Sequence, residues 1–429
     1  MSRNLLSMPA FGKVRNRLTL FFFSSFLMSS PAFSQPAFDP FLERLLKKHP
    51  QRFAKILKER KQYELQILYT KIDRDRKGQP QFAIYRYGVD ANRYFYPAST
   101  IKLAAAALAL EKLNNLNISG LNKHTAMLTL AEQPSQTEAL HDSTSSDGLP
   151  SVGHYIRKVL VASDNDAYNR LYEFLGQQYF NETMHKKGYD NFRAIHRLGV
   201  SLTPEENRHT NPVRFISGDR VIYEQKAGYC ETDFSAPKPI LRGEAYMDGD
   251  RIVNEPMDFR EKNAFGLADQ QLFLRNLMFP ERASEQQKLN LTDDDYRFLY
   301  QYMSQLPIET QYPAHYNETM DDASMKYLLF GKTRKRTPRQ IRSFNKTGEA
   351  YGYLLDNAYI ADFEMGIEFM LAAVIYCNKD QVLNDDSYDY DTIGYQFMAD
   401  LGKTILEYEL GRRRNNRPDI EKFEVEYDK

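Results

Sequence analysis

The sequence predicts an α+β fold, in which one antiparallel sheet built from both chain ends is flanked by helices and joined to a mainly helical middle domain. Three observations support this prediction: strand-like segments occur early in the chain, they return near its end, and helical patterning dominates residues 116–310 between them. The chain has 429 residues, of which 42% are hydrophobic. This is enough apolar material for a sizeable core and roughly two to three domain-sized units.

Residues 1–34 have the pattern of an export signal. Four basic residues and no acid come first: Arg3, Lys13, Arg15 and Arg17. An apolar run of 11 residues follows at 18–28, which is short for a bilayer span, and Ala32-Phe33-Ser34 provides a small-x-small cleavage site. We therefore expect export to the periplasm or the extracellular space, with no stable membrane span after cleavage. An uncleaved membrane anchor is the alternative.

The first elements of the mature chain alternate between helix and strand. Residues 38–60 carry apolar side chains at helical spacing and predict one amphipathic helix. Residues 64–73 and 81–88 predict two strands joined by a Gly-Pro-containing turn. Residues 101–113 are apolar on nearly every side and include four consecutive alanines, so we expect a fully buried helix there.

The end of the chain returns to strands. Strand-length segments lie at 342–350, 352–362 and 367–378, and an amphipathic helix is expected at 392–409. Residues 218–254 are rich in Tyr, Gly and charge, and they predict a β-like insertion with a turn at Met247-Asp248-Gly249-Asp250.

These elements predict two domains. Residues 35–98 and 340–429 would form the sheet domain, and residues 99–339 the mainly helical domain, with insertions at about 218–254 and 311–341. Within the second insertion and just beyond it, residues 332–342 contain six basic side chains, which a solvated loop explains more simply than a ligand patch.

Three short motifs carry the chemistry: Ser99-Thr100-Ile101-Lys102, Ser163-Asp164-Asn165 and Lys346-Thr347-Gly348. Ser99 and Lys102 would lie one helical turn apart at the start of the buried helix. Burial and a second nearby cation, Lys346, would lower the pKa of Lys102, so that a neutral amine could activate the serine. Each motif also has a simpler interpretation, since Ser163-Asp164-Asn165 suits a helix N-cap and Lys346-Thr347-Gly348 suits a turn at a strand end.

Together and in this order, the motifs resemble the S-x-x-K, S-D-N and K-T-G set of class A β-lactamases, within the penicillin-recognising serine hydrolases. A second S-x-x-K match, Ser235-Ala236-Pro237-Lys238, is excluded because its prolines prevent a helix interior. The resemblance covers roughly residues 38–410. It includes S-D-N-x-A-x-N-x-L over 163–171, and the two ends of the family's omega loop resemble Arg197-Leu198 and Thr210-Asn211-Pro212.

The resemblance implies a role for each matching position. Ser99 would be the acylated nucleophile, Lys102 its base, and Ser163 the group that passes a proton to the leaving nitrogen. Asn165 would hold the substrate amide and Lys102, while Lys346 and Thr347 would bind the substrate carboxylate. The oxyanion hole would consist of the backbone N–H groups of Ser99 and Glu349. Gly348, the glycine of the third motif, and Glu349 would also belong to the substrate-binding residues.

Three departures from the family pattern are visible. Thr203 stands where the family's loop carries the glutamate that activates water, and Glu205 and Glu206 are the nearby acids that could replace it. Glu349 occupies a position where the family has a small residue. The interval between the second and third motifs is also much longer than in the family.

The charge balance and the cysteine and histidine content argue against nucleic-acid-binding and metal-binding proteins. The 57 basic and 57 acidic side chains argue against a nucleic-acid partner. With two cysteines and no metal-type histidine spacing, we predict no metal and no cofactor; Cys230 and Cys377 could form one disulfide. The sequence gives no indication of the oligomeric state.

The leading prediction is an exported serine hydrolase that is acylated on Ser99 by a small-molecule β-lactam or a related amide. A D-alanyl-D-alanine cell-wall peptidase or transpeptidase is one alternative, because it would use the same serine and lysine. The other is a non-catalytic binding protein on the same fold.

Overall fold

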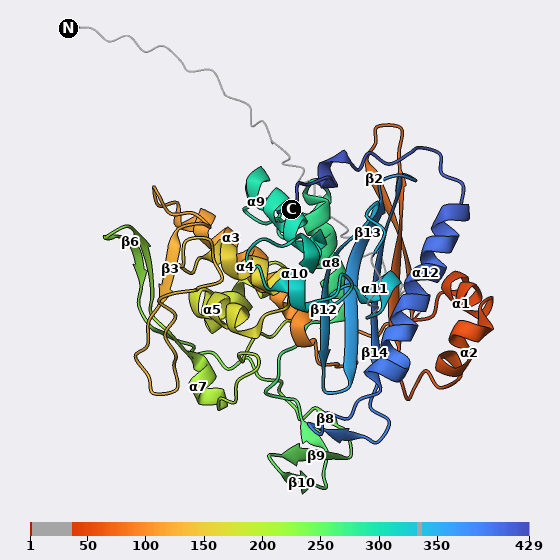
Figure 1. The fold of residues 1–429 in the computed structure, drawn as a ribbon, viewed down its shortest axis with the longest axis horizontal. Coiled ribbons are helices and arrows are strands. Elements are labelled where there is room, and N and C mark those ends of the chain that lie inside the picture. Colours follow the sequence, from red (N-terminus) through yellow and green to blue (C-terminus); the bar gives the residue numbers. More distant parts are fainter. Residues whose placement is uncertain (2–36, 333–336, 429) are drawn as a thin grey trace. The chain divides into compact units, whose positions relative to one another are not determined.

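The computed structural model describes residues 37–332 and 337–428, together with Met1. The predicted export signal lies outside the described residues apart from Met1. The centre of residues 37–428 is a five-stranded antiparallel sheet in the order β12-β13-β14-β1-β2 (Figure 1). Its strands are β1 (Gln66–Arg74), β2 (Pro80–Tyr87), β12 (Ile341–Ala350), β13 (Tyr353–Asp362) and β14 (Ile367–Tyr376). The α+β architecture with a sheet from both chain ends is therefore confirmed.

The two faces of the sheet pack against different helices. Strands β13 and β14 are buried along their whole length. Successive side chains of a strand point to opposite faces, so Leu68 and Ile72 join one hydrophobic core while Ile67 and Tyr69 join the other. Helix α8 (Leu267–Met278) packs on the face of Leu68 and Ile72. Helix α12 (Tyr395–Gly411) packs on the opposite face together with α1 (Pro40–Lys47) and α2 (Pro50–Lys58).

The prediction of one helix over 38–60 is wrong, because the segment forms two helices. These are α1 (Pro40–Lys47) and α2 (Pro50–Lys58). Pro50 has no N–H to donate and disfavours a helical conformation at His49, so the first helix ends before it. Pro50 then occupies the first position of α2, where its missing N–H costs nothing.

The buried helix is the centre of the helical region. Helix α3 (Lys102–Leu116) follows a 3₁₀ turn, η1 (Ala98–Ile101), and its alanines are inaccessible to solvent. It packs against α4 (Val152–Val161) and α5 (Asn165–Leu175), as Figure 1 shows. The other α-helices of the described residues are α6 (Gln177–Lys186), α7 (Pro204–Arg208), α9 (Asp293–Ser304), α10 (Tyr316–Thr319) and α11 (Tyr327–Phe330).

Short strands interrupt this region, and the helical prediction for 116–310 missed several of them. One small sheet consists of β3 (Ala126–Thr129), β5 (Val213–Ser217) and β6 (Arg220–Gln225), and a two-residue pair joins β4 (His209–Thr210) to β7 (Gly228–Tyr229). Strands this short carry little periodicity for a sequence pattern to reveal.

The β-like character predicted for residues 218–254 is confirmed. This segment contains β6 and β7, together with β8 (Leu241–Arg242), β9 (Ala245–Asp248) and β10 (Arg251–Val253), and β11 (Met257–Asp258) follows it. Gly249 takes the positive φ of 59° that the β9–β10 turn requires. Strand β9 also pairs with β15 (Val382–Leu383), which anchors the insertion to the segment that follows the central sheet.

Three further sequence predictions can be compared with the described residues. Cys230 and Cys377 are both free and buried, so the disulfide between them is not formed. Among residues 37–332 and 337–428, no helix combines the length and hydrophobicity that crossing a bilayer requires. Within the same ranges, no group of three His, Cys, Asp or Glu side chains is arranged to hold a metal ion.

Candidate active site

Ser99 lies in the 3₁₀ turn that leads into the buried helix α3. The residue before it, Ala98, has a φ of +47°, a left-handed conformation that is unfavourable for a side chain with a Cβ. Such local strain is concentrated at functional sites. Ser99 lines a cavity of about 600 Å³, so the predicted nucleophile is on the wall of a substantial pocket.

Lys102 is fully buried one turn further along. Its Nζ donates to the backbone oxygen of Ser163 at 2.5 Å and to Asn165 Oδ1 at 2.6 Å, and it lies 3.3 Å from Ser163 Oγ. Burial, reinforced by the nearby Lys346 ammonium, holds the pKa of Lys102 well below its usual range. This shift favours the neutral amine that the sequence predicted for Lys102. The hydrogen bonds also show that the motif containing Lys102 contacts the motif Ser163-Asp164-Asn165, as expected.

The direct contact expected between Ser99 and Lys102 is not formed. In the part of the chain that the structure describes, no hydrogen bond joins the Ser99 hydroxyl to Lys102 Nζ, because the amine is directed toward Ser163 and Asn165. Hydrogen bonds of catalytic groups are often long before substrate binds and shorten in the complex.

Ser163 connects the two lysines. Lys346 Nζ donates to Ser163 Oγ at 2.9 Å and to the backbone oxygen of Thr347 at 3.0 Å. Ser163 itself has a φ of +60°, whereas Asp164 next to it caps helix α5 by accepting a hydrogen bond from Ala167 N. The second motif therefore serves both as a helix cap and as part of the site.

Strand β12 places the third motif against Ser99. A Cβ on Gly348 would lie 2.8 Å from the oxygen of Pro97 and 3.1 Å from both Ala98 Cβ and Ser99 N. Only glycine allows the strand to approach this closely. The backbone positions 99 and 349, from which the predicted oxyanion hole would be built, consequently line the same cavity.

The Glu349 side chain is bound by two tyrosines. The hydroxyls of Tyr327 and Tyr395 both donate to its Oε2, the first at 2.9 Å. Lys332 donates to the Tyr395 hydroxyl at 3.1 Å and lines the cavity with Glu349. The Glu349 carboxylate, which stands where the family has a small residue, is therefore part of a hydrogen-bonded network.

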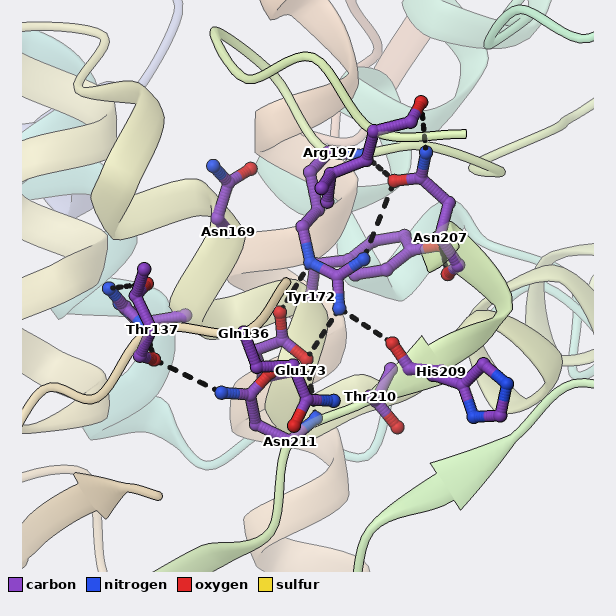
Figure 2. Close-up of polar contacts among 12 residues, drawn as sticks. Gln136, Thr137, Asn169, Tyr172, Glu173, Arg197, Asn207, His209, Thr210 and Asn211 are labelled. Carbon is purple, nitrogen blue, oxygen red and sulfur yellow. Dashed lines mark hydrogen bonds and ion pairs between the residues drawn. The ribbon is translucent and has the colours of Figure 1, made fainter. Parts of the chain in front are cut away.

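A buried ion pair fixes the two ends of the segment 197–211. Figure 2 shows the Arg197 guanidinium paired with the Glu173 carboxylate, at 2.5 Å and 3.0 Å. Glu173 also accepts a hydrogen bond from the backbone N–H of Asn211 at 2.8 Å. Asn207 joins the same network, because its Oδ1 accepts from Arg197 N at 2.9 Å. No local pattern in the sequence indicated the role of Glu173, which lies on α5.

The segment between these ends is close to the site at Gly199. This residue has a φ of +69°, and a Cβ there would lie 2.7 Å from Asn165 Nδ2. Gly199 therefore brings the segment against the amide that holds Lys102.

Glu205 and Glu206 do not line the cavity that contains Ser99. Glu206 accepts hydrogen bonds from the backbone N–H and hydroxyl of Thr203 at the start of α7, and these bonds lower its pKa. Glu205 is largely exposed, pairs with His209 at 3.5 Å and lines a neighbouring cavity of about 940 Å³. These positions give no support to a role for either glutamate in deacylation.

The cavity also has walls that the motifs did not indicate. Aromatic side chains contribute much of the lining: Tyr96, His196, Tyr351, Tyr388, Tyr390 and Tyr395. The His196 ring stacks on Tyr96 with an interplanar angle of 3°, and burial lowers its pKa to about 4. The tyrosines at 388, 390 and 395 were a visible compositional signal, but nothing local to them indicated which surface they would face.

Comparison with known proteins agrees with the motifs. Residues 50–225 match the family model described as the beta-lactamase enzyme family. The resemblance is thus confirmed over the span that carries Ser99, Lys102, Ser163 and Asn165, while the third motif lies beyond the matched residues. The comparison with curated proteins gives no match.

Several solved structures are similar to this chain. The TLA-3 extended-spectrum beta-lactamase is 14% identical, with 86% of this chain and 99% of that chain covered and a TM-score of 0.47. A beta-lactamase from Burkholderia phymatum is 14% identical, with 85% and 98% covered and a TM-score of 0.48. One from Desulfarculus baarsii DSM 2075 is 16% identical, with 86% and 99% covered and a TM-score of 0.44.

Proposed function

We propose that this chain is an exported serine hydrolase that is acylated on Ser99 by a β-lactam or a related amide and then hydrolyses the acyl-enzyme. One observation carries the proposal: Lys102, Ser163 and Lys346, from three distant segments, form a single hydrogen-bonded group beside the turn that holds Ser99. The family match over residues 50–225 supports the same chemistry.

Acylation would use the groups in a fixed order. The neutral Lys102 amine takes the Ser99 proton, and Ser99 Oγ forms a bond to the substrate carbonyl carbon. The backbone N–H groups of Ser99 and Glu349 stabilise the resulting oxyanion. Ser163 Oγ then delivers a proton to the leaving nitrogen, the carbon–nitrogen bond breaks, and Lys102 returns its proton to Ser163.

Substrate binding would depend on charge. Lys346 and Thr347 bind the substrate carboxylate at the edge of the sheet, and the Asn165 amide holds the substrate's acylamino group. The tyrosines that line the cavity of Ser99 would supply apolar and stacking contacts.

A second function, transfer of the acyl group in a D-alanyl-D-alanine peptidase or transpeptidase, is favoured by one observation. Neither Glu205 nor Glu206 lines the cavity of Ser99. Without a loop carboxylate to activate water, the acyl-enzyme would persist long enough to react with another acceptor.

Product analysis separates the two functions. The full chain is incubated with a penicillin and, in parallel, with a peptide ending in D-alanyl-D-alanine, and the products are identified by mass spectrometry. Ring-opened penicillin without released D-alanine supports the hydrolase, and released D-alanine supports the peptidase. If Ser99→Ala forms as much product as the wild type, the assigned nucleophile is wrong in both cases.

A further inference from the structure

The first two helices carry a strong excess of positive charge in a chain that has none overall. Residues 40–61 contain α1, α2 and the turn after them, and we refer to this segment as the basic helix pair. It has eight basic and two acidic side chains, whereas the rest of the chain has 49 basic and 55 acidic ones. No step of the mechanism above uses this segment. A local net charge of +6 in a chain of zero net charge points to an anionic partner.

The charges of the basic helix pair are accessible to a partner. Seven of its eight basic side chains are exposed: Arg44, Lys47, Lys48, Lys55, Lys58, Arg60 and Lys61. The eighth, Arg52, is partly buried and pairs with Glu407 of α12 at 2.8 Å. Glu43 pairs with Lys47 at 2.8 Å, but an exposed pair of this kind is weak and is easily exchanged for another partner. The fold therefore leaves most of this positive charge facing solvent.

An apolar pocket of about 300 Å³ lies between two of these lysines, where α1 ends and α2 begins. Its lining consists of Leu46, Lys47, Pro50, Ala54, Leu57 and Lys58. Lysine side chains combine an apolar stem with a charged end, so Lys47 and Lys58 border the pocket while their ammonium groups stay in water. Phe38, just before α1, is 40% exposed, and the Arg60 guanidinium lies 5.2 Å from the centre of its ring. Apolar and cationic groups thus share one surface.

We propose that the basic helix pair docks on a membrane surface that contains anionic phospholipids. Lys47 and Lys58 contact lipid phosphates, and the pocket between them receives the apolar part of the lipid next to the headgroup. Amphipathic helices with basic residues beside apolar ones bind in the interface of anionic membranes in this way. A soluble polyanion would use the same charges but offers nothing to the apolar pocket, so the pocket favours a lipid surface. The proposal does not rest on the hydrolase function proposed above.

Co-sedimentation with vesicles tests the docking itself. The chain is prepared from Gln35, the expected N-terminus after cleavage, because the apolar run at 18–28 would bind any vesicle. This chain contains every helix and strand of the structure. We expect binding to vesicles of phosphatidylglycerol and phosphatidylcholine in equal amounts, weakening as salt is added, and none to phosphatidylcholine alone. Absence of binding to the anionic vesicles, or equal binding to both kinds, would overturn the proposal.

Substitution of the two lysines locates the docking surface. Lys47→Gln and Lys58→Gln should each weaken binding to the anionic vesicles about fivefold, and together about 25-fold. The matched control is the double variant Lys186→Gln/Lys238→Gln, which removes two exposed lysines outside the basic helix pair. If the control loses as much affinity as the double variant at 47 and 58, the attraction is a property of the whole surface and the proposal is wrong.

The pocket is tested by two substitutions of similar size at Ala54, an exposed position on α2. Both Gln and Leu favour helix, so both variants should fold. Ala54→Gln places a polar group in the pocket and should weaken binding to the anionic vesicles, whereas Ala54→Leu should keep or strengthen it. Equal affinities of the two variants would show that the pocket does not contact lipid. Binding of the unsubstituted chain to polyphosphate but not to the anionic vesicles would identify a soluble polyanion as the partner and overturn the proposal.

Discussion

The Lys346 ammonium donates a hydrogen bond of 2.9 Å to Ser163 Oγ, although 183 positions separate the two residues in the sequence. The same hydroxyl oxygen lies 3.3 Å from Lys102 Nζ. Ser163 thereby joins the edge strand of the central sheet to the buried helix that begins beside Ser99. This three-residue group is the feature on which the proposed chemistry depends.

Replacement of Lys102 by arginine should remove the base and leave a charge. The wild-type amine is neutral when the pH exceeds its lowered pKa, so acylation should fall as the pH drops through that pKa. A guanidinium stays protonated, and we expect Lys102→Arg to reduce the acylation rate constant by about 10²–10⁴-fold at pH values above the pKa of Lys102. Stopped-flow measurements with a chromogenic β-lactam check this, and a variant that keeps the wild-type rate would exclude Lys102 as the base.

The close approach of Gly348 to the turn that holds Ser99 can be tested by a substitution that adds one methyl group. Gly348→Ala should push β12 away from Ser99, because the new Cβ would lie 2.8 Å from the oxygen of Pro97. We expect acylation to fall by about 10²–10³-fold in a folded protein, the cost of losing one oxyanion-hole donor. Gly411→Ala is the control, since no atom lies within 4 Å of a Cβ at that position. Equal rates in the two variants would contradict the assigned role of this contact.

The two loop glutamates should have no part in releasing the acyl group. Glu206 is held by Thr203, and Glu205 faces a different cavity from Ser99. The lifetime of the acyl-enzyme, followed by intact-protein mass after removal of excess β-lactam, should therefore be the same in Glu205→Gln, Glu206→Gln and the wild type. A longer lifetime in either variant would show that the carboxylate reaches the acyl group by a movement of the loop.

The buried ion pair of Figure 2 should determine stability. Arg197→Met leaves the Glu173 carboxylate buried without its partner, which costs about 3–5 kcal/mol of the free energy of unfolding. The double variant with Glu173→Leu should recover part of that loss, because the unpaired charge is gone. Denaturant unfolding of both variants provides the measurement. A double variant that is no more stable than Arg197→Met would refute this explanation.

The sequence predicted the parts of the site that have a local pattern. The apolar, alanine-rich sequence of residues 101–113 predicted that this helix is buried. The strand pattern of residues 342–350 predicted that Lys346 lies on the sheet. The capping role of Glu206 was not predicted, although Thr203 and Glu206 have the spacing of a capping box. The break at Pro50 follows from the chemistry of proline in the same way.

Other features depend on tertiary contacts and leave no such pattern. Glu173 meets Arg197 across 24 positions, and Asp356 accepts a hydrogen bond from Asn345 on the neighbouring strand. Ser99 was expected to contact Lys102, but the amine found better acceptors in Ser163 and Asn165. Tertiary packing, and not spacing along the chain, determines which nearby polar group a buried amine contacts.

The most direct test of the account is the mass of the intact protein after incubation with a penicillin, with the modified residue located by peptide mapping. We expect one covalent adduct equal to the mass of the penicillin, on Ser99, and none in Ser99→Ala. An unmodified Ser99 with no hydrolysed penicillin would contradict it and would favour a binding protein that uses the same fold without the chemistry.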